Sequence, residues 1–272
     1  MSLPKPSAHT AALVTGASAG IGSAIAHELA ARGHNLVLVA RRREKLEELA
    51  GQLTAEHGVR AEALACDLGK PAPRGRLPGR IAELELDVDV LINNAGFATN
   101  GPFVDADADR ELEQVRLLVE AVVALCSAFT PAMARAKRGA ILNVASTAGM
   151  QPLPYSAGYS AAKACVLTFS EALHQELRGR GVTVTALAPG PVTTEFWEIS
   201  GWSVHGGQPF ESAVPKPAWV SPEEAARAGI QGLEHGQRVV VPGLQVRTAM
   251  QAARYLPHAV KLPALEWIMR RR

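Results

Sequence analysis

Cysteine is scarce in this sequence, and the few thiols lie far apart. The 272 residues contain only Cys66, Cys126 and Cys165, and no two of them form a CxxC pair. An odd number of widely spaced cysteines argues against a disulfide framework and against a zinc site of paired thiols. No HExxH or similar ligand spacing occurs either, so we predict no metal site. Free thiols fit a reducing compartment, and we expect a cytoplasmic protein.

An excess of charge of one sign is also missing. Lys and Arg together number 28 and Asp and Glu 26. This near balance gives no general electrostatic reason to expect a nucleic acid partner, so none is predicted. The basic clusters at 41–43 and 270–272 therefore need local explanations.

No apolar run looks long enough to cross a membrane. The best candidate, LLVEAVVALCSAF at 117–129, is short and contains Glu120. The first ten residues, MSLPKPSAHT, are not followed by the apolar core of a signal peptide. We therefore expect no integral membrane segment.

The residues that are present alternate between two patterns. Short runs rich in Val, Leu, Ile and Ala, typical of buried strands, are separated by longer stretches typical of helices. The predicted strands are AALVTG, NLVLVA, RAEALACD, VDVLINNAG, GAILNVAS, VTVTALAPG and QRVVVPG, and the clearest helices lie near 21–32, 43–57, 107–136 and 158–179. Such alternation builds an α/β fold with a doubly wound parallel sheet. No composition break divides the chain, so we predict one domain over 1–272.

Two segments stand apart from this alternation. Residues 191–220 are rich in Gly, Pro and Trp, and their length indicates a lid over a substrate site. Residues 243–272 form a C-terminal extension that would pack as a helix, contact another subunit or lie on a membrane surface. We favour the packed helix or the subunit contact, because terminal segments with this many apolar residues usually bury them.

The first predicted strand runs directly into the turn TGASAGIG. Its three glycines, Gly16, Gly20 and Gly22, allow tight backbone geometry and the close approach of a pyrophosphate. The free N–H groups at the start of the next helix would supply donors and the positive end of a dipole. The GxxxGxG spacing is weak by itself, but its place between a strand and a helix predicts a dinucleotide site.

Arg41 and Arg42 follow the second predicted strand, where NAD-binding folds usually carry an acid for the ribose 2′-hydroxyl. A guanidinium cannot accept that hydrogen bond, but its planar donors suit a 2′-phosphate. The cofactor is therefore predicted to be NADP(H). The alternative is a solvated first turn of a charged helix, since Arg43, Glu44 and Lys45 continue the charge.

Several motifs together resemble one family, the short-chain dehydrogenases/reductases. They are TGASAGIG at 15–22, CDL at 66–68, NNAG at 93–96, NVAS at 143–146, YSAAK at 159–163 and PGPVTT at 189–194. The resemblance covers about 10–245. It implies a Rossmann-like doubly wound sheet of about seven strands and assembly as a homodimer or homotetramer.

The resemblance also implies a reaction. Tyr159 is similar to the family's general acid/base, Lys163 to the ammonium beside it, and Ser146 to the hydroxyl that steadies a substrate carbonyl. The expected reaction moves a hydride between NADP(H) and a carbonyl or secondary alcohol. A free phenol titrates near pH 10, and we expect the ammonium and an oxidised nicotinamide to lower the pKa of Tyr159.

The same resemblance assigns the cofactor contacts. It places the adenine near Asp67 and Leu68, and it places the nicotinamide ribose on Lys163. The full predicted set is Gly16, Ser18, Gly20, Ile21, Gly22, Arg41, Arg42, Asp67, Leu68, Asn94, Ala95, Gly96, Tyr159, Lys163, Pro189, Gly190, Val192 and Thr194.

One position departs from the family pattern. Leu118 stands where the family usually has a fourth catalytic residue, an asparagine that holds a water for the proton relay. Two interpretations follow. The chain is an enzyme with reduced or rerouted proton transfer, which we favour, or it is an NADP(H)-binding relative that acts as a cofactor sensor or interaction protein.

The predicted lid contains much of the chain's small aromatic content, in Phe196, Trp197, Trp202, Phe210 and Trp219. Such side chains at a cofactor mouth favour an apolar, lipid-, steroid- or polyketide-like carbonyl or alcohol over a small charged sugar. The alternative is that they anchor a subunit interface.

Overall fold

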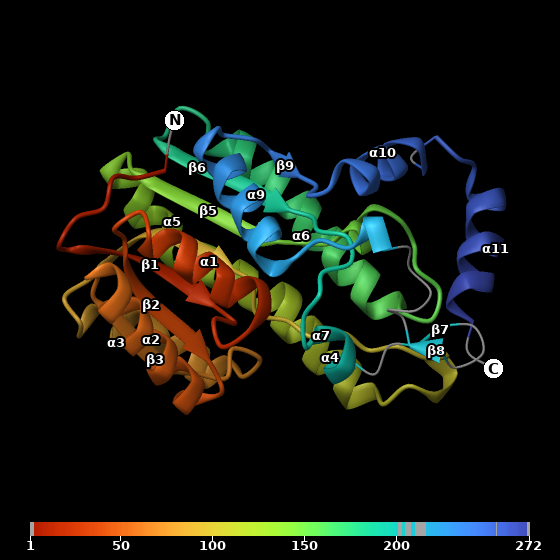
Figure 1. Cartoon of the computed structure of the whole chain (residues 1–272), viewed down its shortest axis with the longest axis horizontal. Coiled ribbons are helices and arrows are strands. Elements are labelled where there is room, and N and C mark those ends of the chain that lie inside the picture. The colour runs from red at the N-terminus through yellow and green to blue at the C-terminus, as the bar shows by residue number, and fades with distance from the viewer. Residues whose placement is uncertain (1–2, 201–202, 205–207, 210–215, 254, 271–272) are drawn as a thin grey trace.

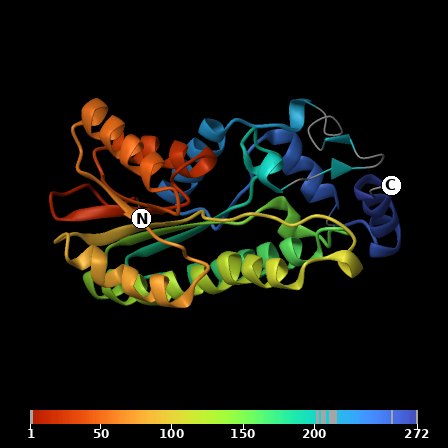
Figure 2. The same ribbon diagram turned by 90° about the horizontal axis from the view of Figure 1, so that it is seen from below.

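A parallel sheet runs through the centre of the molecule, with helices on both faces (Figures 1 and 2). The computed structural model describes residues 3–200, 203–204, 208–209, 216–253 and 255–270. The sheet order is β3-β2-β1-β4-β5-β6-β9, which confirms the predicted doubly wound fold with seven strands. The strands are β1 Thr10–Thr15, β2 Asn35–Ala40, β3 Ala61–Ala65, β4 Asp87–Asn93, β5 Gly139–Val144, β6 Val182–Leu187 and β9 Val239–Val240.

The helices form two layers, visible above and below the sheet in Figure 2. One layer contains α1 (Gly20–Ala30), α2 (Arg43–His57) and α9 (Pro222–Glu234). The other contains α3 (Pro71–Ala82), α5 (Ala121–Ala136) and α6 (Ala157–Glu176). Alternate residues of each strand feed the two cores, because successive side chains point to opposite faces. Both faces are covered, which explains why the strands read as continuous apolar runs.

The long helix predicted near 107–136 is present. It comprises α4 (Ala108–Val115), a π-helical turn at Arg116–Glu120, and α5. By length and composition this stretch, Ala108–Ala136, could cross a membrane, so the estimate that no segment is long enough was wrong. The core helix of a soluble protein passes the same test, and here Leu125 and Phe129 pack against the sheet.

The segment 191–220 contains only short elements among its described residues. These are α7 (Phe196–Ser200), β7 (Ser203–Val204), β8 (Gln208–Pro209) and a 3₁₀ turn at Lys216–Ala218. The extension after Pro242 forms α10 (Leu244–Ala253) and α11 (His258–Met269), at the blue end of the chain in Figure 1. Met269 is buried, whereas Trp267 and Ile268 are exposed. Val246 of α10 is buried as well, so the predicted packing of this tail holds for part of each of its two helices.

The strand order reverses between β1 and β4, which pair in parallel. Crevices form beyond the carboxyl ends of the strands at such a reversal, and ligands of open α/β sheets bind there. The turns after β1, β4 and β5 all open toward this edge. The fold thus directs attention to one end of the sheet.

Candidate active site

A cleft of about 670 Å³ lies at the carboxyl ends of the strands. Its lining includes Ser146, Tyr159 and Lys163 together with every predicted cofactor residue except Gly22. These residues come from segments between Gly16 and Thr194 in the chain. The structure therefore gathers the predicted catalytic and cofactor residues around one cavity.

The glycine turn after β1 needs glycine for two different reasons. Gly16 and Gly20 have φ angles of 65° and 56°, in the left-handed region that other residues rarely adopt. A Cβ on Gly16 would also lie 2.8 Å from the Ala95 Cα, and one on Gly20 would lie 3.0 Å from the Thr194 Cγ2. The turn thus leaves the cleft open and lets neighbouring loops approach closely.

Gly22 has a packing role and lies outside the cleft lining. A Cβ there would lie 2.5 Å from the Asn94 amide nitrogen. That amide donates to the Thr15 carbonyl at 3.0 Å, while the Thr15 hydroxyl accepts from the backbone N–H of Asn94 at 2.9 Å and of Ala95 at 3.1 Å. Gly22 and Asn94 therefore join the end of β4 to the glycine turn and set the width of the cleft.

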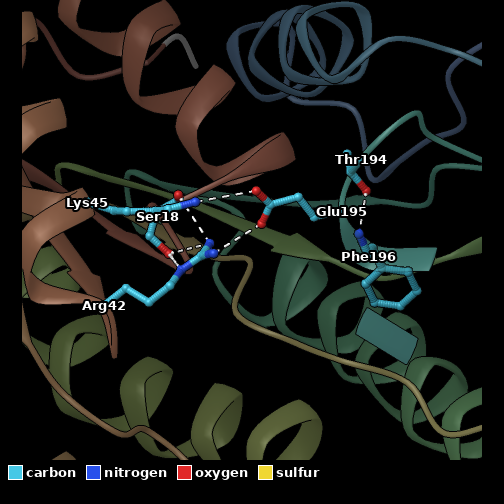
Figure 3. Close-up of polar contacts among 6 residues, drawn as sticks. All are labelled: Ser18, Arg42, Lys45, Thr194, Glu195 and Phe196. Carbon is cyan, nitrogen blue, oxygen red and sulfur yellow. Dashed lines mark hydrogen bonds and ion pairs between the residues drawn. The ribbon is translucent and has the colours of Figure 1, made fainter. Parts of the chain in front are cut away.

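The cationic end of the cleft lies at the start of α2. Arg42 donates from Nε and Nη2 to the Ser18 hydroxyl at 3.2 and 3.1 Å (Figure 3). Its Nη1 pairs with Glu195 Oε2 at 3.1 Å, and Lys45 pairs with Glu195 Oε1 at 3.4 Å. Arg41 lines the same cleft and forms no ion pair with any described residue. The Arg41 guanidinium is thus available for an anionic group, whereas that of Arg42 is engaged with Ser18 and Glu195.

The loop after β3 forms the neighbouring wall. Asp67 accepts a hydrogen bond from the Gly69 N–H at 3.1 Å, which closes the turn. The buried Arg74 donates to the Leu68 carbonyl at 3.0 Å and also pairs with Glu120 of the π-helical turn. The loop that carries Asp67 and Leu68 is therefore held from both α3 and the long helix.

The three predicted catalytic residues meet where α6 passes the end of β5. Tyr159 and Lys163 are four residues apart on α6, so they share one face of the helix. Lys163 Nζ donates to the Val144 carbonyl at 2.7 Å, and a hydrogen bond joins Tyr159 to the Ser146 side chain. The Ser146 hydroxyl also accepts from the Ala148 N–H at 3.1 Å. Three separate predictions thus meet at one point.

Gly149 makes this meeting possible. It lies in the 3₁₀ turn Thr147–Met150 that follows Ser146. A Cβ on Gly149 would lie 2.5 Å from the backbone carbon of Lys163 and 2.7 Å from the Ala164 nitrogen. Any larger residue would push the turn away from α6, and Ser146 would move away from Tyr159 with it.

Burial governs the titration of the catalytic pair. It raises the pKa of Tyr159 to about 12, against which the Ser146 hydrogen bond acts only weakly. It lowers the pKa of Lys163 to about 8. The expected lowering of the Tyr159 pKa is therefore not achieved by the protein's own groups, because Lys163 Nζ lies 5.8 Å from the phenol ring centroid and points to Val144 instead.

The model of the family described as short chain dehydrogenase matches residues 10–201 of the chain. The chain belongs to the short-chain dehydrogenases. These are oxidoreductases, and the match confirms the predicted family.

Known relatives of this short-chain dehydrogenase include very-long-chain 3-oxoacyl-CoA reductases. The very-long-chain 3-oxoacyl-CoA reductase of Anas platyrhynchos is 38% identical over 195 residues, covering 70% of this chain but only 62% of the relative. The reductase-B of Danio rerio is 31% identical over 256 residues, covering 92% and 72%. A short-chain dehydrogenase from Sphingobium yanoikuyae, solved in complex with NADPH, superposes with a TM-score of 0.79 at 33% identity over 95% of this chain and 96% of that one.

Leu118 sets this short-chain dehydrogenase apart from the usual pattern. It is almost fully buried in the π-helical turn and belongs to an apolar cluster with Tyr159, Ala162 and Met269. Its Cδ2 would lie 2.7 Å from a Cβ on Gly96. A side chain without hydrogen-bonding atoms therefore lines the cleft where the family places an amide.

The aromatic side chains of the predicted lid form a connected group. Phe196 lies with its ring centroid 5.9 Å from that of Tyr159 and 5.4 Å from that of Trp197, and Trp197 lies 5.7 Å from Trp219. The Trp197 indole donates to the Val192 carbonyl at 2.6 Å. The other predicted lid aromatics, Trp202 and Phe210, lie outside the described residues.

The sequence reasoning missed four residues of the site. Met269 reaches the cleft from the C-terminal helix, and Gly149, Lys45 and Glu195 act as described above. The charged helix start contained a signal for Lys45, which lies one turn from Arg41. No local signal marked Glu195, Gly149 or Met269, because their partners are remote in the chain.

A possible metal-ligating group lies outside the cleft that contains Tyr159, in a second pocket of about 730 Å³. His27, Glu56 and His57 place ligand atoms within 4.8 Å of one another at the surface of α1 and α2. Exposed groups of this kind are common without a metal ion. The absence of a metal site stays a prediction.

Proposed function

We propose that this protein is an NADP(H)-dependent reductase of an apolar ketone. The observation that carries the proposal is the single cleft: Tyr159, Ser146 and Lys163 line the same cavity as the glycine turn and the arginines at 41 and 42. A proton donor and a dinucleotide cradle in one cavity are what a carbonyl reductase needs.

The described residues fit a 2′-phosphorylated dinucleotide. The glycine turn provides space and the N-terminus of α1 for a pyrophosphate, and Asp67 and Leu68 flank the place of an adenine. Arg41 and Arg42 supply planar donors for a 2′-phosphate. NADPH, when bound, supplies the hydride and its two electrons. The relative solved in complex with NADPH supports the same choice.

In the reductive direction the protein donates one proton, which comes from Tyr159. The substrate carbonyl accepts hydrogen bonds from Tyr159 and Ser146, so its carbon becomes a better hydride acceptor. As the carbon gains the hydride, the Tyr159 phenol transfers its proton to the oxygen, and a secondary alcohol results. A phenol with a pKa of about 12 stays protonated at neutral pH, which suits the donor role. Lys163, one turn further along α6, is the ammonium that would steady the phenolate left behind, once it turns from the Val144 carbonyl toward the phenol.

The cleft favours an apolar substrate. Its far wall is formed by Leu118, Phe196, Trp197 and Met269, which present carbon to the space beside Tyr159. Apolar walls of this kind select ligands by area and shape. The named activity of the duck and zebrafish relatives, reduction of very-long-chain 3-oxoacyl-CoA, supports a ketone on a long hydrocarbon chain.

Leu118 supports a second candidate. A chain with an apolar residue in place of the relay asparagine would bind NADP(H) and signal its presence without turnover. Leu118 is buried against Gly96 and Tyr159, and no described side chain supplies the missing amide there. This supports the cofactor sensor over a harmless substitution that leaves the proton relay intact. We favour the enzyme because the proton donor and its two partners remain together.

The proposal also includes the oligomeric state of the protein and its location in the cell. Exposed Leu112, Val115 and Val123 follow the outer face of the long helix, and their burial between subunits would support a homodimer or homotetramer. The three free cysteines support a cytosolic location.

Steady-state reduction of a panel of ketones tests the function. We expect NADPH oxidation with 3-oxoacyl thioesters or bulky apolar ketones, and little with small sugars. Tyr159→Phe should reduce kcat at least about a hundredfold, since it removes the proton but preserves the ring. NADPH binding, followed by nicotinamide fluorescence, should change little in this variant. Binding of NADPH with no turnover across the panel would favour the sensor instead.

A further inference from the structure

Glu195 connects the cationic end of the cleft to the segment beside the catalytic tyrosine. Its Oε2 accepts from Arg42 at 3.1 Å and its Oε1 from Lys45 at 3.4 Å (Figure 3). One carboxylate thus bridges two cations at the start of α2, as two oxygens of a phosphate would do. Nothing in the local sequence pairs these residues, because they lie 153 and 150 positions apart.

Arg42 has little remaining capacity while this contact holds. Nε and Nη2 are directed to Ser18, and Nη1 is directed to Glu195. Ser18, Arg42 and Glu195 all line the large cleft. An anion that entered between Ser18 and Arg42 would therefore meet a carboxylate already bound to the same cations.

The carboxylate would repel such an anion. The hydrogen bond from Arg42 and the charge of Lys45 lower the pKa of Glu195, so it is ionised at neutral pH. Like charges this close cannot share two exposed cations without cost. Since Arg42, Lys45 and Glu195 are each nearly half exposed, their ion pairs are weak and exchange readily.

Displacing Glu195 would affect both of its neighbours. Thr194 packs over Gly20 of the glycine turn, and its hydroxyl accepts from the Phe196 N–H at 3.3 Å. The Phe196 ring lies against Tyr159 and Trp197. The backbone that carries Glu195 therefore also positions the aromatic wall of the substrate space.

We propose that Glu195 is a specificity-determining residue that competes with the cofactor's 2′-phosphate for Arg42 and Lys45. A nucleotide with a 2′-phosphate displaces it and frees 194–197, whereas a nucleotide without that phosphate leaves the contact intact. This inference rests on the proposed NADP(H) preference and deepens it. The protein then senses the phosphate at the substrate space as well as at the cationic end.

Binding of adenosine 2′,5′-diphosphate and of adenosine 5′-diphosphate to the full chain tests this competition without any nicotinamide. Glu195→Gln should bind the 2′,5′-diphosphate about fivefold more tightly than the wild type, while the Kd of the 5′-diphosphate changes less than about twofold. The gain should shrink as salt rises from about 0.05 M to about 0.5 M, since the groups are exposed.

Glu47→Gln is the matched control. Glu47 lies on α2, the helix that carries Lys45, and it is about as exposed as Glu195. It pairs with Arg43 at 3.4 Å but touches neither Arg42 nor Lys45. It should leave both Kd values within about twofold of the wild type. An equal gain in Glu47→Gln would overturn the proposal, because general charge would then explain the effect.

The emission of Trp197 gives a second measurement, obtained as the difference between each protein and its Trp197→Phe version. In the wild type we expect the 2′,5′-diphosphate to change this emission and the 5′-diphosphate to leave it unchanged. Glu195→Gln should respond to neither, since its segment is already released. Equal responses of the wild type to both nucleotides would contradict the coupling.

The outcomes also separate this inference from the function on which it rests. A wild type that prefers the 2′,5′-diphosphate, with no tightening in Glu195→Gln, overturns the role of Glu195 and leaves the NADP(H) proposal standing. A wild type that binds both nucleotides equally overturns the NADP(H) preference, and the competition with it.

Discussion

The two ends of the cleft are built in different ways. The cofactor end uses short turns that each follow one strand, and its main requirement is backbone geometry at Gly16 and Gly20. The substrate end uses side chains from the long helix, the 191–220 segment and the C-terminal helix, as Leu118, Phe196 and Met269 show. The cofactor end therefore tolerates few substitutions, whereas substitutions at the substrate end can alter which ligand is bound.

The largest effect should come from the backbone of the cofactor end. Gly16→Ala forces a side chain into the left-handed region and against Ala95. We expect NADPH affinity to fall at least about a hundredfold, as measured by nicotinamide fluorescence. Gly51→Ala is the control, because a Cβ there meets no atom within 4 Å. Retained affinity in Gly16→Ala would refute the need for this turn.

Lys163 lies between the two ends of the cleft, and Lys163→Met tests what its buried charge costs the folded protein. Burial lowers the Lys163 pKa from 10.5 to about 8, so below pH 8 the folded protein bears the cost of a buried ammonium. Allowing for the lost bond to Val144, the variant should be about 2 kcal/mol more stable at pH 7 while turnover falls strongly.

The sign of the pH dependence follows from the protons bound. Between pH 8 and 10.5 the unfolded chain keeps the Lys163 proton and the folded wild type loses it, so wild-type stability rises with pH. The advantage of Lys163→Met should therefore shrink across this window in urea unfolding. An advantage that stays constant with pH would show that the ammonium is not the cause.

Leu118→Asn tests whether the substrate end has lost a proton relay. We expect kcat to rise by a few fold, because an amide restores a group that can hold water beside Lys163. Stability should fall by about 1–3 kcal/mol, since the amide replaces a buried apolar side chain. Leu118→Ala is the control that opens the same position without adding a polar group. An unchanged or lower kcat in Leu118→Asn would count against a relay explanation.

The smallest effect is expected at the C-terminal helix. Met269→Ala removes part of the apolar wall beside Tyr159, so the space there becomes larger and a bulky substrate loses a contact. KM for a long-chain ketone should rise by about three- to tenfold, while the NADPH Kd stays unchanged. Ile268→Ala, exposed on the same helix, should leave both constants unchanged. A change in the NADPH Kd on Met269→Ala would contradict the assignment of Met269 to the substrate end alone.

Sequence reasoning was most successful where partners are close in the chain or follow a strand. The alternation of strands and helices predicted the parallel sheet, and the YSAAK spacing placed Tyr159 and Lys163 on one face of α6. It was less successful where burial decides. The pKa of Tyr159 rises because desolvation outweighs the hydrogen bond with Ser146, and that balance depends on packing from several elements.

The membrane estimate shows the same limit. Glu120 seemed to interrupt the apolar run, yet the helix continues through it, because Glu is a good helix former and its half-exposed carboxylate pairs with Arg74 of another helix. A local reading cannot see a partner 46 residues away.

By itself, the sequence determined the fold class and predicted the candidate site residues that the structure gathers around one cleft. These depend on hydrophobic period, turn chemistry and short motifs, all of which act over a few residues. Only the tertiary structure decided that Glu195 meets Arg42 and Lys45, that Gly149 lets Ser146 approach Tyr159, and that Met269 closes the substrate wall. The physical reason is that such contacts are fixed by the packing of whole elements, which brings together residues that no local pattern connects.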